Sequence, residues 1–346
     1  MKILALLVFG MQAAWAIDPS ANMKSIYSDI TTVYNHLDEK NCQKSLKHLN
    51  QIKEKADKLG KHFFLEADGY RVSYKIFRTN LNELIYACET KTSDPKYRKT
   101  LYRGLVQSCF QCHSSDRVTR DGSSLVLKGA AGDRVAHLMV SRNYELAKQE
   151  INKYFKKGSK EDLADVLALE QDLYLKYFND SKSLIKSYEK RKIGKKWDGK
   201  LKLWAMTLKS LPKFKKKAEL LKAAETAVKT RIGMMADDSE ALRIKHMIGR
   251  LLTLLHESGG NEAAKVLYFL GSLENRLEHS HYSVDNIYLT ECLLSHNKSP
   301  YADKCYAEFK DQVELSFTGS AVGTKVPENI QQLLKELNPK SKRPKK

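Results

Sequence analysis

Two cysteines and a histidine stand in the spacing C-x-x-C-H within LVQSCFQCHSSDR, residues 105–117. On a helical turn, Cys109 and Cys112 present both sulfurs on one face. Each sulfur can form a thioether with a vinyl group of haem, and His113 can then bind the iron as its proximal ligand. The spacing therefore predicts one haem c, covalently attached through Cys109 and Cys112.

Three other interpretations of this spacing compete with haem attachment. A thioredoxin-like dithiol belongs in an α/β context, whereas the sequence around the motif has helical periodicity. A zinc site needs a further pair of ligands with similar spacing, and none stands nearby in the sequence. A chance match on a core helix is the third alternative. An export signal and the position of the motif at a helix end favour haem over it.

The first residues bear on the compartment. The chain opens MKILALLVFGMQAAWAIDPS, with Lys2 before an apolar run over residues 3–11 and a small-residue cleavage site at residues 14–16. This is the pattern of a secretory signal peptide over residues 1–16, with Ile17 as the first mature residue. A membrane anchor is the alternative, but spanning a bilayer takes about 20 apolar residues. We expect a soluble protein that is periplasmic or otherwise exported.

Export permits disulfides. Outside the motif the chain has four cysteines, Cys42, Cys88, Cys292 and Cys305. Four cysteines allow three connectivities, and the simplest is local: Cys42 with Cys88, and Cys292 with Cys305. Free buried thiols are the alternative.

Apolar residues recur every three or four positions along almost the whole chain, which predicts an all-α protein. Four helices are expected before the motif ends. They cover residues 20–37, 40–59 and 66–90, and a fourth opens at Asp94-Pro95 and closes at the motif. Gly60 is expected to end the second helix.

Residues 118–133 contain three glycines and lose the helical period, so we expect a linker there. Helices then resume in pairs up to residue 337, and residues 338–346 form a basic tail without apolar residues to pack. The expected helices cover residues 134–156, 160–178, 182–192, 197–210, 214–231, 238–257, 261–279, 283–295, 300–317 and 327–337. The segment NYELAKQEINKYF, residues 143–155, resembles the second helix of a tetratricopeptide repeat, but no fixed repeat period emerges. An irregular helical-hairpin array is therefore expected over residues 134–337.

The position of the C-x-x-C-H motif resembles that in class II cytochromes c, the cytochrome c′ family, over residues 17–117. In class I the motif lies near the start of the domain, whereas here four expected helices lead up to it. Arg117 also follows His113 by four residues, as in the class II pattern, although Asp116 stands where that family usually has an aromatic residue. The resemblance implies a four-helix-bundle c-type cytochrome domain in which Arg117 helps to bind the haem.

Bundle geometry suggests a second iron ligand. In an up-down-up-down bundle the first helix starts at the end where the fourth finishes. Met23 lies just inside the first helix and His113 near the end of the fourth, so at about 1.5 Å per residue their depths match. Met23 is therefore the candidate distal ligand, as in low-spin class II members. The alternatives are that Met23 fills the core and that the sixth position is open.

Positive charge is concentrated after the linker. The chain has a formal net charge of +19, and residues 181–222 hold 15 Lys or Arg against 3 Asp or Glu, a net charge of +12. By comparison, residues 17–116 hold 16 Lys or Arg against 12 Asp or Glu, a net charge of +4. We expect this basic segment to dock an acidic redox partner, and an anionic membrane surface is a further possibility; a solvated helical face is the alternative. Export argues against nucleic acid. The candidate docking residues are Lys195, Lys196, Lys200 and Lys202.

The sequence contains no phosphate loop, nucleophile elbow or H-E-x-x-H motif. These patterns predict an electron carrier rather than an enzyme: an exported monohaem cytochrome whose helical domain contacts partners. Two alternatives stay open. One is a haem-based gas or redox sensor with an open sixth site, and the other is a helical-repeat interaction protein in which haem is structural.

Overall fold

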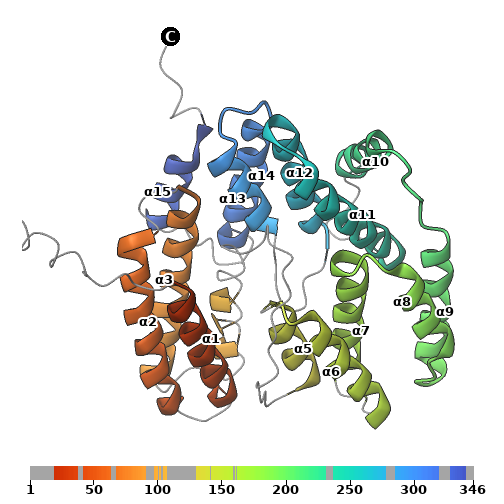
Figure 1. The fold of residues 1–346 in the computed structure, drawn as a ribbon, viewed down its shortest axis with the longest axis horizontal. Coiled ribbons are helices and arrows are strands. Elements are labelled where there is room, and N and C mark those ends of the chain that lie inside the picture. Colours follow the sequence, from red (N-terminus) through yellow and green to blue (C-terminus); the bar gives the residue numbers. More distant parts are fainter. Residues whose placement is uncertain are drawn as a thin grey trace, which may run out of the picture. The chain divides into compact units, whose positions relative to one another are not determined.

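In the part of the chain that the computed structural model describes, every regular element is a helix and none is a strand, which confirms the all-α prediction (Figure 1). The chain divides into two compact units, Met1–Tyr102 and Arg103–Lys346. The expected domain boundary near residue 117 lies outside the described residues. Those are residues 19–37, 42–63, 68–90, 97–99, 101–102, 104–106, 130–140, 142–158, 160, 162–230, 237–277, 285–318 and 328–339.

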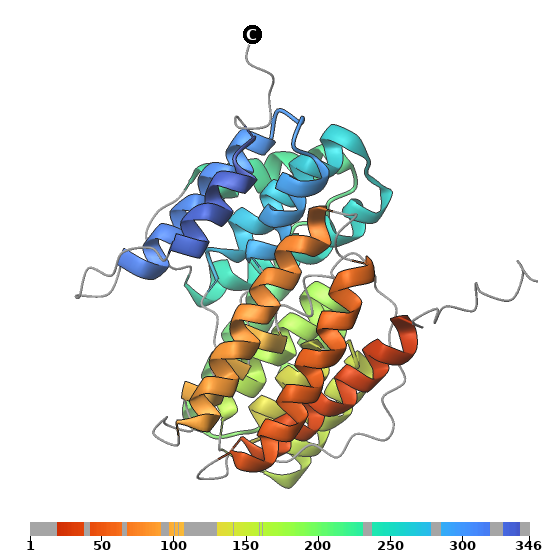
Figure 2. The same cartoon turned by 90° about the vertical axis from the view of Figure 1, so that its left-hand side faces the viewer.

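The long helices in the described part of the first unit are α1 (Pro19–His36), α2 (Gln43–Phe63) and α3 (Asp68–Glu89). Helix α1 packs on α2 and α2 on α3, as the three neighbouring red-to-orange helices of Figure 2 show. Their apolar residues recur every three or four positions and form the core. In α1 this buried stripe is Ile26, Ile30 and Val33, and it continues to Leu37, which directly follows the helix. Tyr27, next to this stripe, is only partly buried.

The bounds of α2 differ from the expected 40–59 at both ends. Helix α2 starts at Gln43 because Cys42 has a left-handed φ of 37°, which a helix cannot include. Gly60 does not end the helix, which continues to Phe63. A glycine inside a helix costs about 1 kcal/mol relative to alanine, which packing of the rest of the helix can offset.

The second unit is an array of helices joined mostly by short turns. Consecutive helices pack as neighbours in the pairs α5·α6, α8·α9, α11·α12, α12·α13 and α13·α14. The elements are α5 (Ala131–Val140), α6 (Tyr144–Lys157), α7 (Leu163–Asp172), a π-helical turn η1 (Leu173–Tyr177), α8 (Ser181–Lys190), α9 (Lys195–Lys209), α10 (Lys217–Lys229), α11 (Asp238–Glu257), α12 (Gly260–Glu274), α13 (Asp285–Ser295), α14 (Ala302–Thr318) and α15 (Glu328–Leu337).

The helix expected over residues 134–156 is two helices. Arg142 adopts a left-handed φ of 61°, and the Asn143 N–H donates to the Leu138 carbonyl at 2.8 Å, which closes the last turn of α5. Helix α5 also begins at Ala131, so the last three residues of the expected 118–133 linker are helical.

The helix expected over residues 160–178 starts later than expected, and its last residues form a π-helical turn instead of an α-helix. Asp162 is left-handed, with a φ of 56°, and α7 begins only after it. At the other end, the Phe178 N–H donates to the Leu173 carbonyl, five residues back, in the π-helical pattern of η1. Gly249 of α11 packs against this turn, where an added Cβ would lie 2.0 Å from the Leu175 carbonyl oxygen. Only glycine allows so close an approach.

One large apolar cluster joins α5 through α9 and includes Val135, Ile151, Leu167, Leu184 and Trp204. None of the helices that the structure describes is long and apolar enough to cross a membrane.

Candidate functional site

The residues of the C-x-x-C-H motif, Cys109, Cys112 and His113, lie outside the described residues, and so does Arg117. Met23 belongs to α1, but its side chain is not among those described. Among the described residues, no group of three His, Cys, Asp or Glu side chains is arranged to hold a metal ion. The haem site therefore stays a prediction, and the structure bears on it through the elements that lead to it.

The segment that leads to the motif is helical wherever it is described, at residues 97–99, 101–102 and 104–106. Buried Arg98 donates through Nη2 to the Leu37 carbonyl at 3.3 Å, and the Tyr102 hydroxyl donates to the Ile30 carbonyl at 3.2 Å. The Tyr102 ring also lies 5.5 Å from that of Tyr34. Arg98 contacts Leu37, just after the end of α1, and Tyr102 contacts Ile30 within α1, so the segment runs antiparallel to α1.

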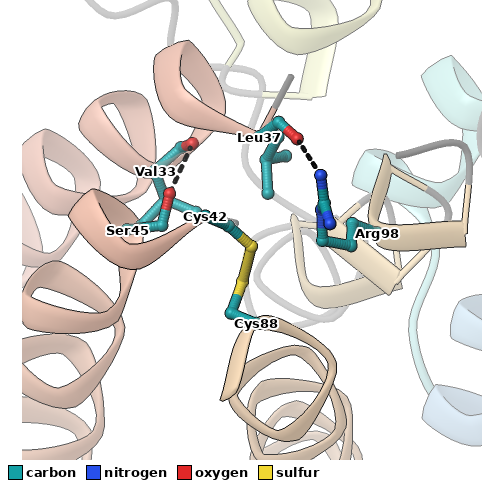
Figure 3. The surroundings of a disulfide bond; sticks show 6 residues. All are labelled: Val33, Leu37, Cys42, Ser45, Cys88 and Arg98. Atoms are coloured by element: carbon teal, nitrogen blue, oxygen red, sulfur yellow. Dashed lines mark hydrogen bonds between the residues drawn. A yellow bond between two sulfur atoms is a disulfide. The ribbon is translucent and has the colours of Figure 1, made fainter. Parts of the chain in front are cut away.

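A disulfide between Cys42 and Cys88 joins the start of α2 to the end of α3, with a Cα–Cα distance of 5.2 Å (Figure 3). Both cysteines are buried. On the same side, Ser45 donates through Oγ to the Val33 carbonyl at 3.4 Å, which ties α2 to α1. Figure 3 shows Leu37 and Arg98 beside this disulfide. The ends of α1 and α3, the start of α2 and the segment toward the motif thus meet at one end of the first unit.

The second disulfide joins Cys292 of α13 to Cys305 of α14, with a Cα–Cα distance of 6.4 Å. Both residues are fully buried. The two local pairs expected from the sequence are the pairs that the structure forms, and neither pair is present as free thiols.

A polar cluster between α1 and α2 was not expected from the sequence. Asp29 Oδ1 lies 2.9 Å from His48 Nδ1, and Asp29 Oδ2 lies 2.5 Å from Lys55 Nζ, which also donates to Ser25 Oγ at 2.7 Å. The signal in the sequence was a single carboxylate, Asp29, between the buried positions Ile26 and Ile30. The cluster fixes the register of α1 against α2, because it satisfies a nearly buried carboxylate.

The expected docking lysines have different surroundings. Lys195, Lys196 and Lys202 are exposed on α9. In contrast, Lys200 pairs with Asp238 at 2.8 Å and lies over the rings of Trp197 and Trp204, 5.5 and 5.1 Å from their centroids. Lys200 therefore contacts residues of its own unit, while the other three lysines are exposed to solvent.

Beside the start of α9 lies an open cavity of about 510 Å³. Lys160, Lys195 and Lys196 line it together with Asp162 and Asp165, so both signs of charge are present. Trp197 forms part of the wall. This mixed lining gives the cavity no clear preference for an anion or a cation.

A buried charge cluster joins α7 and η1 to α11 and α12. Lys176 of η1 is 2.9 Å from Glu274 and 3.5 Å from Asp172, and Asp172 also pairs with Lys245 at 2.8 Å. Burial alone would lower the pKa of Lys176, but the charges of Asp172 and Glu274 outweigh it and raise the pKa. Lys176 is therefore charged at neutral pH, and the cluster holds η1 in place.

No family model matches this chain, and no curated protein or solved structure does either. The class II cytochrome c resemblance consequently rests on the residues of the motif and the helices before it.

Proposed function

We propose that this chain is an exported c-type cytochrome with one haem that carries single electrons and is not an enzyme. The C-x-x-C-H spacing at residues 109–113 carries the proposal, because it offers two thiols and an imidazole as haem attachment requires. Bound haem would supply one-electron chemistry through its iron. In this proposal residues 17–117 form a class II-like four-helix bundle, and residues 134–337 form a helical-repeat-like domain for partner contacts.

Each motif residue has one role in the proposal. Cys109 and Cys112 hold the haem by thioether bonds, and His113 binds the iron on the proximal side. Arg117 is assigned to cofactor binding by the class II resemblance alone.

The register of the segment before the motif supports Met23 as the distal ligand. Arg98 bonds opposite Leu37 and Tyr102 opposite Ile30, so the segment runs toward the N-terminal end of α1. If the helix continues in this direction past residue 106, residues 109–113 come level with the first turns of α1, where Met23 stands. A thioether sulfur at this position is a suitable axial ligand and raises the reduction potential.

Two observations support export. The opening residues have the pattern of a signal peptide, and the two buried disulfides are typical of proteins that fold in an oxidising compartment. We propose that the protein works in the periplasm or in another exported location.

Mass spectrometry of full-length protein from a host with cytochrome c maturation tests the proposal. We expect the mass of one haem to be added to the chain. We also expect the absorption spectrum of this protein to be that of low-spin haem. The Cys109→Ser/Cys112→Ser variant should lose the haem, whereas the matched Cys292→Ser/Cys305→Ser variant should keep it. Wild-type protein from this host with both motif thiols free to alkylate would overturn the proposal.

The same spectrum separates electron transfer from sensing. A high-spin spectrum that changes on addition of carbon monoxide or nitric oxide would instead support a gas or redox sensor with an open sixth position.

A further inference from the structure

Helix α9 presents one continuous exposed face. Its opposite face, with Leu201, Trp204, Ala205 and Leu208, is buried in the core of the second unit. The exposed positions follow the helical period and contain no acidic residue. They are Lys195, Lys196, Gly199, Lys202, Leu203, Met206 and Lys209.

Two large apolar side chains stand on this face. Leu203 is 52% exposed and Met206 is 60% exposed. Because they are three residues apart on a helix, they are neighbours and form one apolar patch. Within the described part of the second unit, they are the large apolar side chains that are most exposed.

Lysine side chains surround the patch. Lys195, Lys196 and Lys202 form no ion pair with any residue that the structure describes. Lys209 pairs with Glu189 at 2.5 Å, but both side chains are largely exposed, so solvent screens the pair. Lys200 does not belong to this exposed face, because it pairs with Asp238 of α11.

We propose that the α9 face, defined as Lys195, Lys196, Lys202, Leu203 and Met206, docks a protein whose surface has acidic residues around an apolar centre. The inference refines the partner-docking role in the proposed function and names the surface and the partner class. An apolar centre inside a charged rim is the usual anatomy of a protein interface, and methionine is enriched there. The lysines would guide the approach of the partner, and the apolar pair would hold it.

Other occupants fit this face less well. An interfacial helix inserts a broad apolar face into a membrane, whereas the other apolar residues of α9 are buried in the protein. A second copy of the chain would bring like charges together, because the face carries lysines and no carboxylate. Nucleic acid would use the lysines but would leave the exposed Leu203 and Met206 without a role.

Peptide binding by full-length protein tests the inference. The probes are an acidic amphipathic helical peptide with two leucines one turn apart, polyglutamate of equal charge, and vesicles of phosphatidylcholine with phosphatidylglycerol. We expect the amphipathic peptide to bind about tenfold more tightly than polyglutamate, since an apolar anchor adds to the charge attraction. Leu203→Gln/Met206→Gln should remove this advantage.

A charge-matched control separates this face from the overall positive field. Lys195→Gln/Lys196→Gln/Lys202→Gln should weaken binding of the amphipathic peptide about tenfold at low salt. Lys182→Gln/Lys186→Gln/Lys190→Gln removes the same charge from exposed positions of α8 and should weaken it by about twofold at most. Circular dichroism checks that each variant is folded.

Three results would overturn the inference: equal losses in the two lysine variants, no loss in Leu203→Gln/Met206→Gln, or vesicle binding without preference between the peptides. None of these measurements depends on haem. Protein from a host with cytochrome c maturation that carries haem but does not distinguish the peptides would overturn the docking inference alone. Protein from the same host that carries no haem but does distinguish the peptides would overturn the proposed function alone.

Discussion

Lys176 of η1 and Glu274 of α12 form a buried ion pair, with Nζ 2.9 Å from Oε2, although 98 residues separate them in the sequence. Both side chains are almost completely inaccessible to solvent. A buried charge is tolerated when it is paired, so each residue depends on the other. The pair links the π-helical turn η1 to helix α12, which starts 83 residues beyond the end of that turn.

Breaking this pair on one side should destabilise the protein. Glu274→Gln leaves the Lys176 charge buried with less compensation, and we expect a loss of about 3 kcal/mol in the free energy of unfolding, measured by urea denaturation. The double variant Lys176→Met/Glu274→Leu should recover most of this loss, because apolar side chains then replace both charges. Glu225→Gln, which removes an exposed i,i+4 partner of Lys229, is the control and should change stability little. A loss as small as in this control would contradict the buried-pair explanation.

A second prediction concerns Gly249. An alanine there would bring its Cβ 2.0 Å from the Leu175 carbonyl oxygen, so the backbone of α11 or η1 must move. We expect Gly249→Ala to lower the free energy of unfolding by at least about 2 kcal/mol. Gly199→Ala on α9 is the matched control, because no atom lies within 4 Å of its added Cβ. That substitution should stabilise the helix by about 0.5–1 kcal/mol. Thermal denaturation of the two variants should therefore shift in opposite directions.

The two disulfides should differ in their contribution to stability. Cys42 and Cys88 are 46 residues apart, and closing a loop of this length contributes about 4 kcal/mol in the chain-entropy model. Cys292 and Cys305 are 13 residues apart, which gives about 3 kcal/mol. Guanidinium denaturation of the two double serine variants should show the larger loss for the first pair. Peptide mapping under non-reducing conditions should show Cys42 linked to Cys88, and a link to Cys292 or Cys305 would contradict the local pairing.

Buried His137 predicts a pH dependence of stability. Burial lowers its pKa from 6.5 to about 4, so the folded protein keeps it neutral. As pH falls below about 6.5, the unfolded chain binds a proton there that the folded chain does not, and stability falls until about pH 4. The shift corresponds to about 3 kcal/mol. His137→Gln should flatten the decline in the free energy of unfolding between pH 6.5 and 4, and an unchanged slope would contradict this role.

If Met23 binds the iron, Met23→Ala should convert a low-spin spectrum to a high-spin one. Loss of the sulfur ligand should also lower the reduction potential and increase the affinity for carbon monoxide. Met206→Ala on α9 is the control and should leave the spectrum unchanged. An unchanged low-spin spectrum in Met23→Ala would show that another residue supplies the sixth ligand.

Helix α11 shows what local sequence can determine. Its bounds were predicted as residues 238–257, and Asp237 caps it by accepting the Glu240 N–H at 2.8 Å. Apolar periodicity and a capping side chain lie within the helix or next to it, so they can be read without knowledge of the fold. The disulfide pairs were predictable in the same way, since both join neighbouring helices of a hairpin.

Such local patterns predicted the all-α class, most of the helices and the disulfide pairs. They also led to the C-x-x-C-H hypothesis. The tertiary structure decided the left-handed break at Arg142, the π-helical turn against Gly249, the pairing of Lys176 with Glu274, and the engagement of Lys200 with Asp238. Each of these depends on a backbone conformation or on contacts between helices distant in sequence, and no periodicity within one helix encodes which helix will lie beside it. The exposed pair Leu203 and Met206 follows from the same cause, because only packing determines which side of α9 the core covers.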